Sequence, residues 1–201
     1  LGAKNIILAT GSVPRSLPFI EMDGKYILTS DEILEVKTPP KSLIIMGSGA
    51  VGVEFASIYS RFGTKVRVIE LLDRCLPNED KEVSEEFQKL FKKRGIPIHT
   101  GTQVKQAKQT GDRVVVTVDD GKKSTELEAD MLLVAVGRAP LTTGLNLEKV
   151  GVEVDQGGCI QVDGFMRTSV PSVFAIGDIV RTPQLAHVAS AEAILAVDCI
   201  A

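Results

Sequence analysis

Short runs of apolar residues, bounded by glycine, proline or polar residues, recur along the chain. Residues 42–46 read SLIIM, and residues 131–137 read MLLVAVG. Runs of this length and composition predict strands that are buried on both faces. Further strands are predicted over residues 4–9, 65–70, 96–100 and 172–177, with an edge segment over 159–162.

Apolar residues at helical spacing lie between these strands. Residues 50–62 read AVGVEFASIYSRF, and Gly63 follows where a helix of this length would end. A strongly charged segment from about residue 80 to 94 also predicts a helix, which Gly95 terminates. Two more helices are predicted, a short one over 30–36 and a final one from about residue 184 onward.

The pattern changes between residues 101 and 130. The segments VKQAKQT, RVVVTV and STELEA alternate polar and apolar positions and are separated by turns at Gly111-Asp112 and at Asp119-Asp120-Gly121. Alternation of this kind predicts a three-stranded antiparallel meander. Strands alternate with helices elsewhere, so the predicted fold class is α/β, a Rossmann-type parallel sheet with this meander inserted.

Composition and charge exclude several classes of function. The 201 residues carry 26 acidic and 23 basic side chains, a formal net charge of -3, which gives no basic surface for nucleic acid or an anionic membrane. No apolar run approaches the roughly 20 residues of a membrane-spanning helix. The three cysteines, Cys75, Cys159 and Cys199, form no CxxC pair or metal knuckle.

The strongest chemical signal is the GxGxxG sequence Gly47-Ser48-Gly49-Ala50-Val51-Gly52, between a predicted strand and a predicted helix. In a dinucleotide site Gly47 permits the tight turn, Gly49 lets a pyrophosphate approach the backbone, and Gly52 lets helix and strand pack closely. The helix N-terminus offers amide hydrogens to the phosphates. No GK[ST] follows, so the motif is not a P-loop.

An acidic residue lies where this motif requires one. Glu70 ends the next predicted strand, 18 residues after Gly52, close to the spacing of about 20 found in dinucleotide-binding folds. Its carboxylate would accept hydrogen bonds from the adenosine ribose and repel a 2′-phosphate, so NAD is favoured over NADP. The alternative interpretation is a glycine turn followed by a solvated glutamate.

Two other strand ends carry polar residues. Gly177-Asp178 follows an apolar strand and places a carboxylate where α/β folds bind ligands. The alternative is a glycine turn with a helix-capping aspartate. Thr10-Gly11 has the same ambiguity.

Five ordered motifs give the chain a resemblance to the flavoprotein disulfide reductases, which contain two dinucleotide-binding domains. They are Ala9-Thr10-Gly11, Gly47 through Glu54, Glu70, Val136-Gly137-Arg138-Ala139-Pro140, and Thr168 through Asp178. The run Gln184-Leu185-Ala186-His187 is further similar to the dihydrolipoamide dehydrogenase branch of that family. The resemblance covers essentially the whole chain.

The resemblance implies roles for individual residues. Val104 would contact adenine through its backbone, Gly137 would lie at the nicotinamide end, and Asp178 would bind the flavin ribityl chain. The positions implied for NAD are Gly47, Ser48, Gly49, Ala50, Val51, Gly52, Val53, Glu54, Glu70, Val104 and Gly137. The positions implied for FAD are Thr10, Gly11, Ser12, Arg138, Asp178, Gln184, Leu185, Ala186 and His187.

The chain also departs from the family pattern. Leu141 follows Pro140 where the family often has asparagine. The family's CxxxxC redox pair and its FAD GxGxxG do not occur in this sequence. His187 and Glu192 match the spacing of the family's catalytic His-x4-Glu, but we interpret this match as chance. We therefore assign no catalytic residue and no metal ligand in this sequence.

The resemblance leads to an expected domain organisation. We predict the end of a FAD-domain segment and a connector over 1–34, a NAD-binding domain over 35–150, and the start of a second FAD segment over 151–201. The first residues lie close to an apolar run and the last residues follow a helical pattern, so we expect a piece of a longer protein.

The function that the resemblance implies for the intact protein is electron transfer from a dihydrolipoyl dithiol, through a disulfide and FAD, to NAD. The 201-residue chain itself is expected to bind NAD(H) only and to be inactive, with FAD held in the intact protein. Implied partners are the dihydrolipoyl groups of 2-oxo acid dehydrogenase complexes or of the glycine cleavage system, with a homodimer in the intact protein, no nucleic acid and no membrane. The expected compartment is the bacterial cytoplasm or the mitochondrial matrix. Alternatives are a non-catalytic NAD-binding module, or a piece of an NADH oxidase, mercuric reductase or glutathione reductase.

Overall fold

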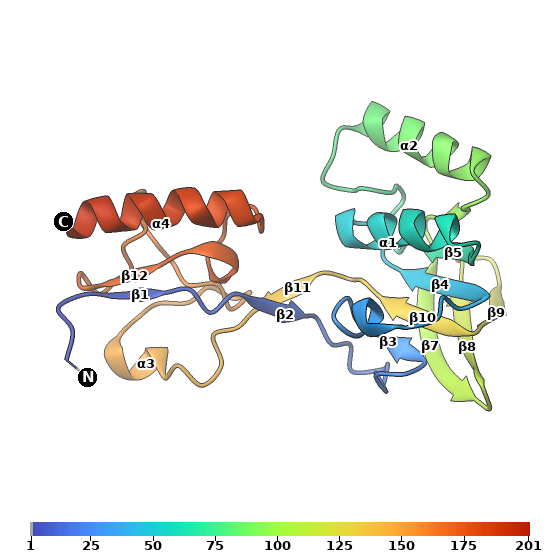
Figure 1. The fold of residues 1–201 in the computed structure, drawn as a ribbon, viewed down its shortest axis with the longest axis horizontal. Helices are drawn as coiled ribbons and strands as arrows, with labels where there is room; N and C mark the ends of the chain where they lie inside the picture. Colours follow the sequence, from blue (N-terminus) through green and yellow to red (C-terminus); the bar gives the residue numbers. More distant parts are fainter. Residues whose placement is uncertain (1) are drawn as a thin grey trace. The chain divides into compact units, whose positions relative to one another are not determined.

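A computed structural model describes residues 2–201, and its contacts divide the chain into two compact units. The central unit is Pro14–Gly137, and the terminal unit combines the residues up to Val13 with Arg138–Ala201. Each unit is coloured along the sequence in Figure 1.

The central unit is built on a parallel sheet of five strands in the order β3-β10-β4-β5-β6. Apolar side chains alternate between the two faces of this sheet, because Leu43 and Ile45 pack on one side while Ile44 packs on the other. The strands are β3 (Ile27–Leu28), β4 (Ser42–Met46), β5 (Lys65–Ile69), β6 (Ile98–His99) and β10 (Met131–Val134).

Two helices cover one face of this sheet. They are α1 (Ala50–Arg61) and α2 (Lys81–Lys93), which lie on the same side in Figure 1. Val53 and Ala56 of α1 and Phe91 of α2 are buried against the sheet. Asp80 caps α2 because its carboxylate accepts the backbone N–H groups of the helix's first turn.

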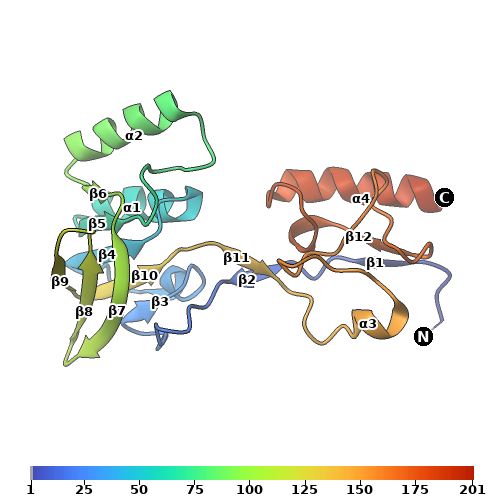
Figure 2. The same ribbon diagram turned by 180° about the vertical axis from the view of Figure 1, so that it is seen from behind.

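A three-stranded antiparallel meander covers the opposite face, as Figure 2 shows from behind. The inward side chains of its central strand, Val114, Val116 and Val118, are buried against Ile44 and its neighbours in the sheet. The strands are β7 (Gln103–Thr110), β8 (Arg113–Asp119) and β9 (Ser124–Ala129). One face of the sheet is therefore covered by helices and the other by strands.

The terminal unit joins segments that are far apart in the sequence. Strand β1 (Ile6–Leu8) pairs in parallel with β12 (Val173–Ala175). Helix α4 (Ala186–Ile200) covers this pair by packing Ala196 against Phe174, and the two elements lie next to each other in both views (Figures 1 and 2). The remaining elements are β2 (Ser12–Pro14), β11 (Arg138–Pro140), α3 (Leu147–Val150) and the 3-10 helix η2 (Gly177–Ile179).

The units group residues differently from the domain ranges predicted from sequence. Residues 14–34 belong to the central unit, since β3 pairs with β10 and Ile33, in the 3-10 helix η1 (Glu32–Glu35), is buried in the same core as α1. Residues 138–150 belong to the terminal unit, where Leu147 joins the core around β12. The extents of the two cofactor-binding domains stay a prediction.

Most predicted elements occur within a few residues of their expected bounds. The α/β fold class is confirmed, including the parallel sheet and the meander. The segment over 159–162 forms only isolated bridges through Ile160. Sequence patterns did not predict the pairing of β2 with β11, since each strand has only three residues.

Replacing Ile45 by alanine should lower the free energy of unfolding by about 2–5 kcal/mol, because the side chain is fully buried between the sheet and the helices. Leu34→Ala is the matched control, since Leu34 is 71% exposed, and should change stability by less than about 0.5 kcal/mol. Urea denaturation followed by circular dichroism measures both. Equal losses would contradict this account of the core.

Candidate functional site

The turn between β4 and α1 depends on glycine at two positions. Gly47 has a φ of 102°, and a Cβ there would collide with the backbone carbonyl of Ala135, which directly follows β10. A Cβ on Gly52 would collide with the carbonyl oxygen of Gly47. Helix α1 therefore packs against the turn at a distance that only glycine permits.

Gly49 lies in a different environment. It is the N-cap of α1, no side chain caps the helix there, and a Cβ on Gly49 would meet no atom within 4 Å. The first amide groups of α1 and the positive end of its dipole therefore lie beside open space. This arrangement can accept an anionic group.

Glu70 follows β5 and its carboxylate is buried, with 7% of the residue exposed. Oε2 accepts hydrogen bonds from the backbone N–H of Ser48 at 2.7 Å and from its hydroxyl at 2.8 Å. Oε1 accepts the N–H of Leu72 at 2.9 Å. The carboxylate thus connects the end of β5 to the glycine turn.

The backbone of Glu70 is equally constrained. Its N–H donates to the carbonyl of His99 at 2.8 Å, and its carbonyl accepts the N–H of Thr102 at 2.8 Å. Burial and the nearby Arg67 lower the pKa of His99. Side chain and main chain together hold Glu70 at the carboxyl edge of the sheet.

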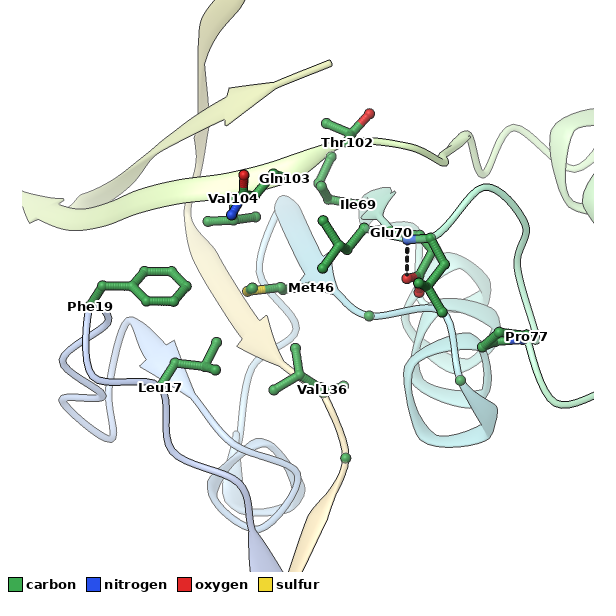
Figure 3. Close-up of a pocket in the computed structure, with 16 residues that line it drawn as sticks. Leu17, Phe19, Met46, Ile69, Glu70, Pro77, Thr102, Gln103, Val104 and Val136 are labelled. Carbon is green, nitrogen blue, oxygen red and sulfur yellow. Dashed lines mark hydrogen bonds between the residues drawn. The ribbon is translucent and has the colours of Figure 1, made fainter. Parts of the chain in front are cut away.

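Gly47, Gly49 and Glu70 border a pocket of about 490 Å³ inside the central unit. Figure 3 shows Leu17, Phe19 and Val136 around one part of the pocket, with Glu70 in another part. A largely apolar pocket with few polar groups suits a ligand with flat rings and a polar link. The lining residues are Leu17, Phe19, Met46, Gly47, Gly49, Ile69, Glu70, Leu71, Leu72, Pro77, Thr102, Gln103, Val104, Ala135, Val136 and Gly137.

The structure brings five of the eleven residues predicted for NAD to this pocket. They are Gly47, Gly49, Glu70, Val104 and Gly137. Ser48, Gly52 and Val53 are buried and do not line it, while Ala50, Val51 and Glu54 lie on the first turns of α1.

Several lining residues were missed by the sequence analysis. Leu17 and Phe19 belong to a segment interpreted as a connector, and no motif marks them. Leu71 and Leu72 directly follow Glu70, so their position next to the predicted ribose ligand was the one signal that could have found them.

A second group of polar residues forms in the terminal unit. Arg138 donates to Ser12 twice, from Nε to the hydroxyl at 2.6 Å and from Nη2 to the carbonyl at 2.7 Å. The hydroxyl of Ser12 in turn donates to Oδ2 of Asp178 at 2.5 Å. Three motifs that are separated in sequence therefore meet in one hydrogen-bonded chain.

The neighbouring Thr10-Gly11 segment is held by Leu141. The hydroxyl of Thr10 donates to the carbonyl of Leu141 at 2.6 Å, and the N–H of Leu141 donates to the carbonyl of Gly11 at 2.8 Å. Both bonds use the main chain of Leu141. The departure from the family's usual asparagine therefore leaves these two contacts in place.

Residues 184–187 lie at the exposed start of α4, for which no side chain supplies a cap. Glu192, farther along the helix, is buried and its Oε2 accepts the N–H of Gly177 at 2.7 Å. Its role in fixing the Gly177-Asp178 turn was not foreseen from the sequence. His187 is exposed.

Neither the thiols of Cys75 and Cys159 nor a metal centre adds chemistry to these sites within residues 2–201. Burial raises the pKa of Cys75 and of Cys159, with nearby carboxylates adding to the effect, so neither thiol is activated. Within the described chain no three His, Cys, Asp or Glu side chains are placed to hold a metal ion. Among the same residues, no helix has both the length and the apolar character to cross a membrane.

Comparison with known proteins finds the same similarity along the whole chain. The sequence profile described as pyridine nucleotide-disulphide oxidoreductase matches residues 1–193. A dihydrolipoyl dehydrogenase from Chlorobaculum tepidum is 48% identical over 202 aligned positions, which cover 100% of this chain and 43% of that protein. The chain thus spans less than half the length of this relative.

Solved structures give the same picture. LpdA from Mycobacterium tuberculosis superposes with a TM-score of 0.89 at 34% identity, covering 96% of this chain and 42% of LpdA. A Cu(II) complex of the HOCl-induced flavoprotein disulfide reductase RclA from Escherichia coli superposes with a TM-score of 0.88 at 28% identity, covering 97% of this chain and 44% of RclA.

Gly52→Ala should lower the free energy of unfolding by about 1–3 kcal/mol, because the added methyl group forces α1 away from the glycine turn. Gly49→Ala is the matched control and should change stability by less than about 1 kcal/mol, since space is open there. Thermal or urea unfolding measures both. If the two variants were equally stable, the close contact at Gly52 would be refuted.

Proposed function

Because the chain belongs to the pyridine nucleotide-disulphide oxidoreductase family, we propose that the pocket of its central unit binds NAD(H). The observation that carries the proposal is the position of Glu70. Its buried carboxylate lies at the pocket wall, bonded to the glycine turn from which α1 begins. A carboxylate there can accept the hydroxyl groups of an adenosine ribose.

The glycine turn supplies the site for the pyrophosphate. The open space at Gly49 admits phosphate oxygens, and the first amides of α1 offer hydrogen bonds to them. Ala50, Val51, Gly52 and Val53 contribute through their place in this first turn. Glu54, exposed on α1, is proposed to belong to the same NAD-binding loop.

Different segments would hold the adenine and the nicotinamide of the dinucleotide. Val104 of β7 is proposed to contact the adenine through its backbone, and Gly137 after β10 marks the nicotinamide end. NAD supplies hydride transfer when bound. The apolar side chains of Leu17, Phe19 and Val136 would orient the ring and exclude water.

We assign the terminal unit to FAD. The hydrogen-bonded group of Ser12, Arg138 and Asp178 supports this, since it fixes a carboxylate at the end of β12. Thr10, Gly11 and residues 184–187 would complete the contacts. We propose the bounds of the two units for the two sites, residues 14–137 for NAD and residues up to 13 with 138–201 for FAD. The ranges expected from the sequence were 35–150 for NAD, with 1–34 and 151–201 for FAD.

The chain matches less than half the length of its dihydrolipoyl dehydrogenase relative. For a full-length protein that contains this chain, the proposed activity is that of a dihydrolipoyl dehydrogenase. In that activity a dihydrolipoyl dithiol would be oxidised to its disulfide and NAD would be reduced to NADH, with release of a proton. A protein disulfide and FAD would supply the redox groups between the two substrates. The proposed partners are the lipoyl groups of 2-oxo acid dehydrogenase complexes or of the glycine cleavage system. A homodimer, and a location in bacterial cytoplasm or mitochondrial matrix, complete the proposal.

A second candidate keeps the NAD(H) site and changes the electron acceptor or donor. The similarity to RclA favours this second candidate. RclA is described as a HOCl-induced flavoprotein disulfide reductase, not as a dihydrolipoyl dehydrogenase, and its matched part has the same fold as this chain. Purified chain that binds NADH but retains no flavin and oxidises no dihydrolipoamide would identify a binding module. Retained FAD with NADH-dependent reduction of another disulfide would favour this second candidate.

Glu70→Gln should weaken NADH binding by about 1–3 kcal/mol, because charge-assisted hydrogen bonds to the ribose are lost. Calorimetric titration of the 201-residue chain measures the change. Glu126→Gln, an exposed carboxylate on β9, is the matched control and should leave affinity unchanged. An unaltered NADH affinity in Glu70→Gln would disprove the ribose role.

A further inference from the structure

We propose that Ser48 is a positioning residue that fixes Glu70 and thereby sets the preference of the pocket for NAD(H) over NADP(H). The proposal rests on the function proposed above, in which Glu70 binds the ribose. It goes beyond that function because it assigns the specificity to a second side chain, one that does not line the pocket.

Both donors of Ser48 hold Glu70 in place. Its N–H and hydroxyl both donate to Oε2 of Glu70, and its carbonyl accepts the N–H of Leu76 at 3.0 Å. Ser48 is 0% exposed. Solvent therefore cannot replace Glu70 as the partner of this hydroxyl, and any movement of the carboxylate would leave a buried donor without an acceptor.

The two oxygens of Glu70 consequently have different tasks. Oε2 accepts two hydrogen bonds from Ser48, which uses its capacity within the protein. Oε1 accepts one, from the N–H of Leu72, which is the bond drawn in Figure 3. Oε1 thus retains an acceptor site, and it is the oxygen assigned to the ribose.

This arrangement explains how discrimination against a 2′-phosphate arises. A glutamate that could turn away would relieve its repulsion with the phosphate and admit NADP(H). Here, turning away would break two hydrogen bonds to Ser48, so the negative charge stays at the pocket wall.

The choice of serine adds to what the glycine motif requires. The second position of GxGxxG is open to several residue types, and alanine at position 48 would keep only the backbone N–H bond. The hydroxyl is therefore a contribution of this sequence, and it can be removed without altering a glycine.

The test is Ser48→Ala in the full 201-residue chain, titrated separately with NADH and NADPH. NADH affinity should fall about threefold to tenfold, the range for the loss of one ordinary hydrogen bond, because the lost bond positions Glu70 and does not itself contact the ligand. NADPH affinity should stay the same or rise, because Glu70 loses one of the two bonds that hold Oε2 and its carboxylate turns away at a lower cost. The ratio of NADH affinity to NADPH affinity should therefore decrease. A general loss of structure would weaken the binding of both ligands and would not lower this ratio.

A double-mutant cycle with Glu70→Gln shows whether Ser48 acts through Glu70. In that background Ser48→Ala should change NADH affinity by less than about twofold. The positioning role would be overturned if Ser48→Ala caused the full loss of NADH affinity in the Glu70→Gln background. It would also be overturned if Ser48→Ala alone did not lower the ratio of NADH to NADPH affinity. Glu70→Gln without effect on NADH would instead refute the proposed function.

Two further variants serve as controls. Thr64→Val removes another buried hydroxyl, which donates to the carbonyl of Pro40 at 2.7 Å, just before β5 begins, and should leave both affinities unchanged. Ser48→Cys keeps a side chain of similar shape with a weak donor and should give an intermediate ratio. If Ser48→Ala does not fold cooperatively, Ser48→Cys can be titrated in its place. A ratio of NADH to NADPH affinity equal to that of the unmodified chain would count against the proposal.

Discussion

The carboxylate of Glu70 is the contact on which the arrangement of the pocket depends. It joins the end of β5 to the glycine turn through Ser48, and its backbone bridges His99 and Thr102. A buried negative charge is stable only where several donors surround it. Three donors do so here, and because they come from two separate segments they also fix the distance between those segments.

The close approach of α1 to the sheet also depends on the glycine turn between β4 and α1. Gly47 and Gly52 leave no room for a Cβ, whereas Gly49 faces open space. Gly47 and Gly52 thus allow the helix to pack close to the sheet, and Gly49 leaves its N-terminus accessible. Since parallel strands end at one edge of a sheet, this N-terminus and the strand-end residue Glu70 lie beside one pocket.

The terminal unit uses a comparable arrangement with different residues. Asp178 follows the end of β12, and Ser12 and Arg138 fix it through a short chain of hydrogen bonds. Glu192 on α4 holds the preceding Gly177. In both units a carboxylate at a strand end is positioned by a serine hydroxyl, although the two serines come from unrelated places in the sequence.

The sequence by itself determined the elements whose signal is local. Apolar periodicity predicted α1, α2 and the long strands, and glycine spacing with an acidic residue predicted the turn and Glu70. Only the tertiary structure decided which residues complete the pocket. Leu17 and Phe19 line it although no local pattern marks them. It also revealed the bonds of Ser48 to Glu70, 22 positions away, and of Ser12 to Asp178, 166 positions away. Helix and strand patterns arise from neighbouring residues, whereas the partner of a buried hydroxyl depends on which distant segments the fold brings within hydrogen-bond distance.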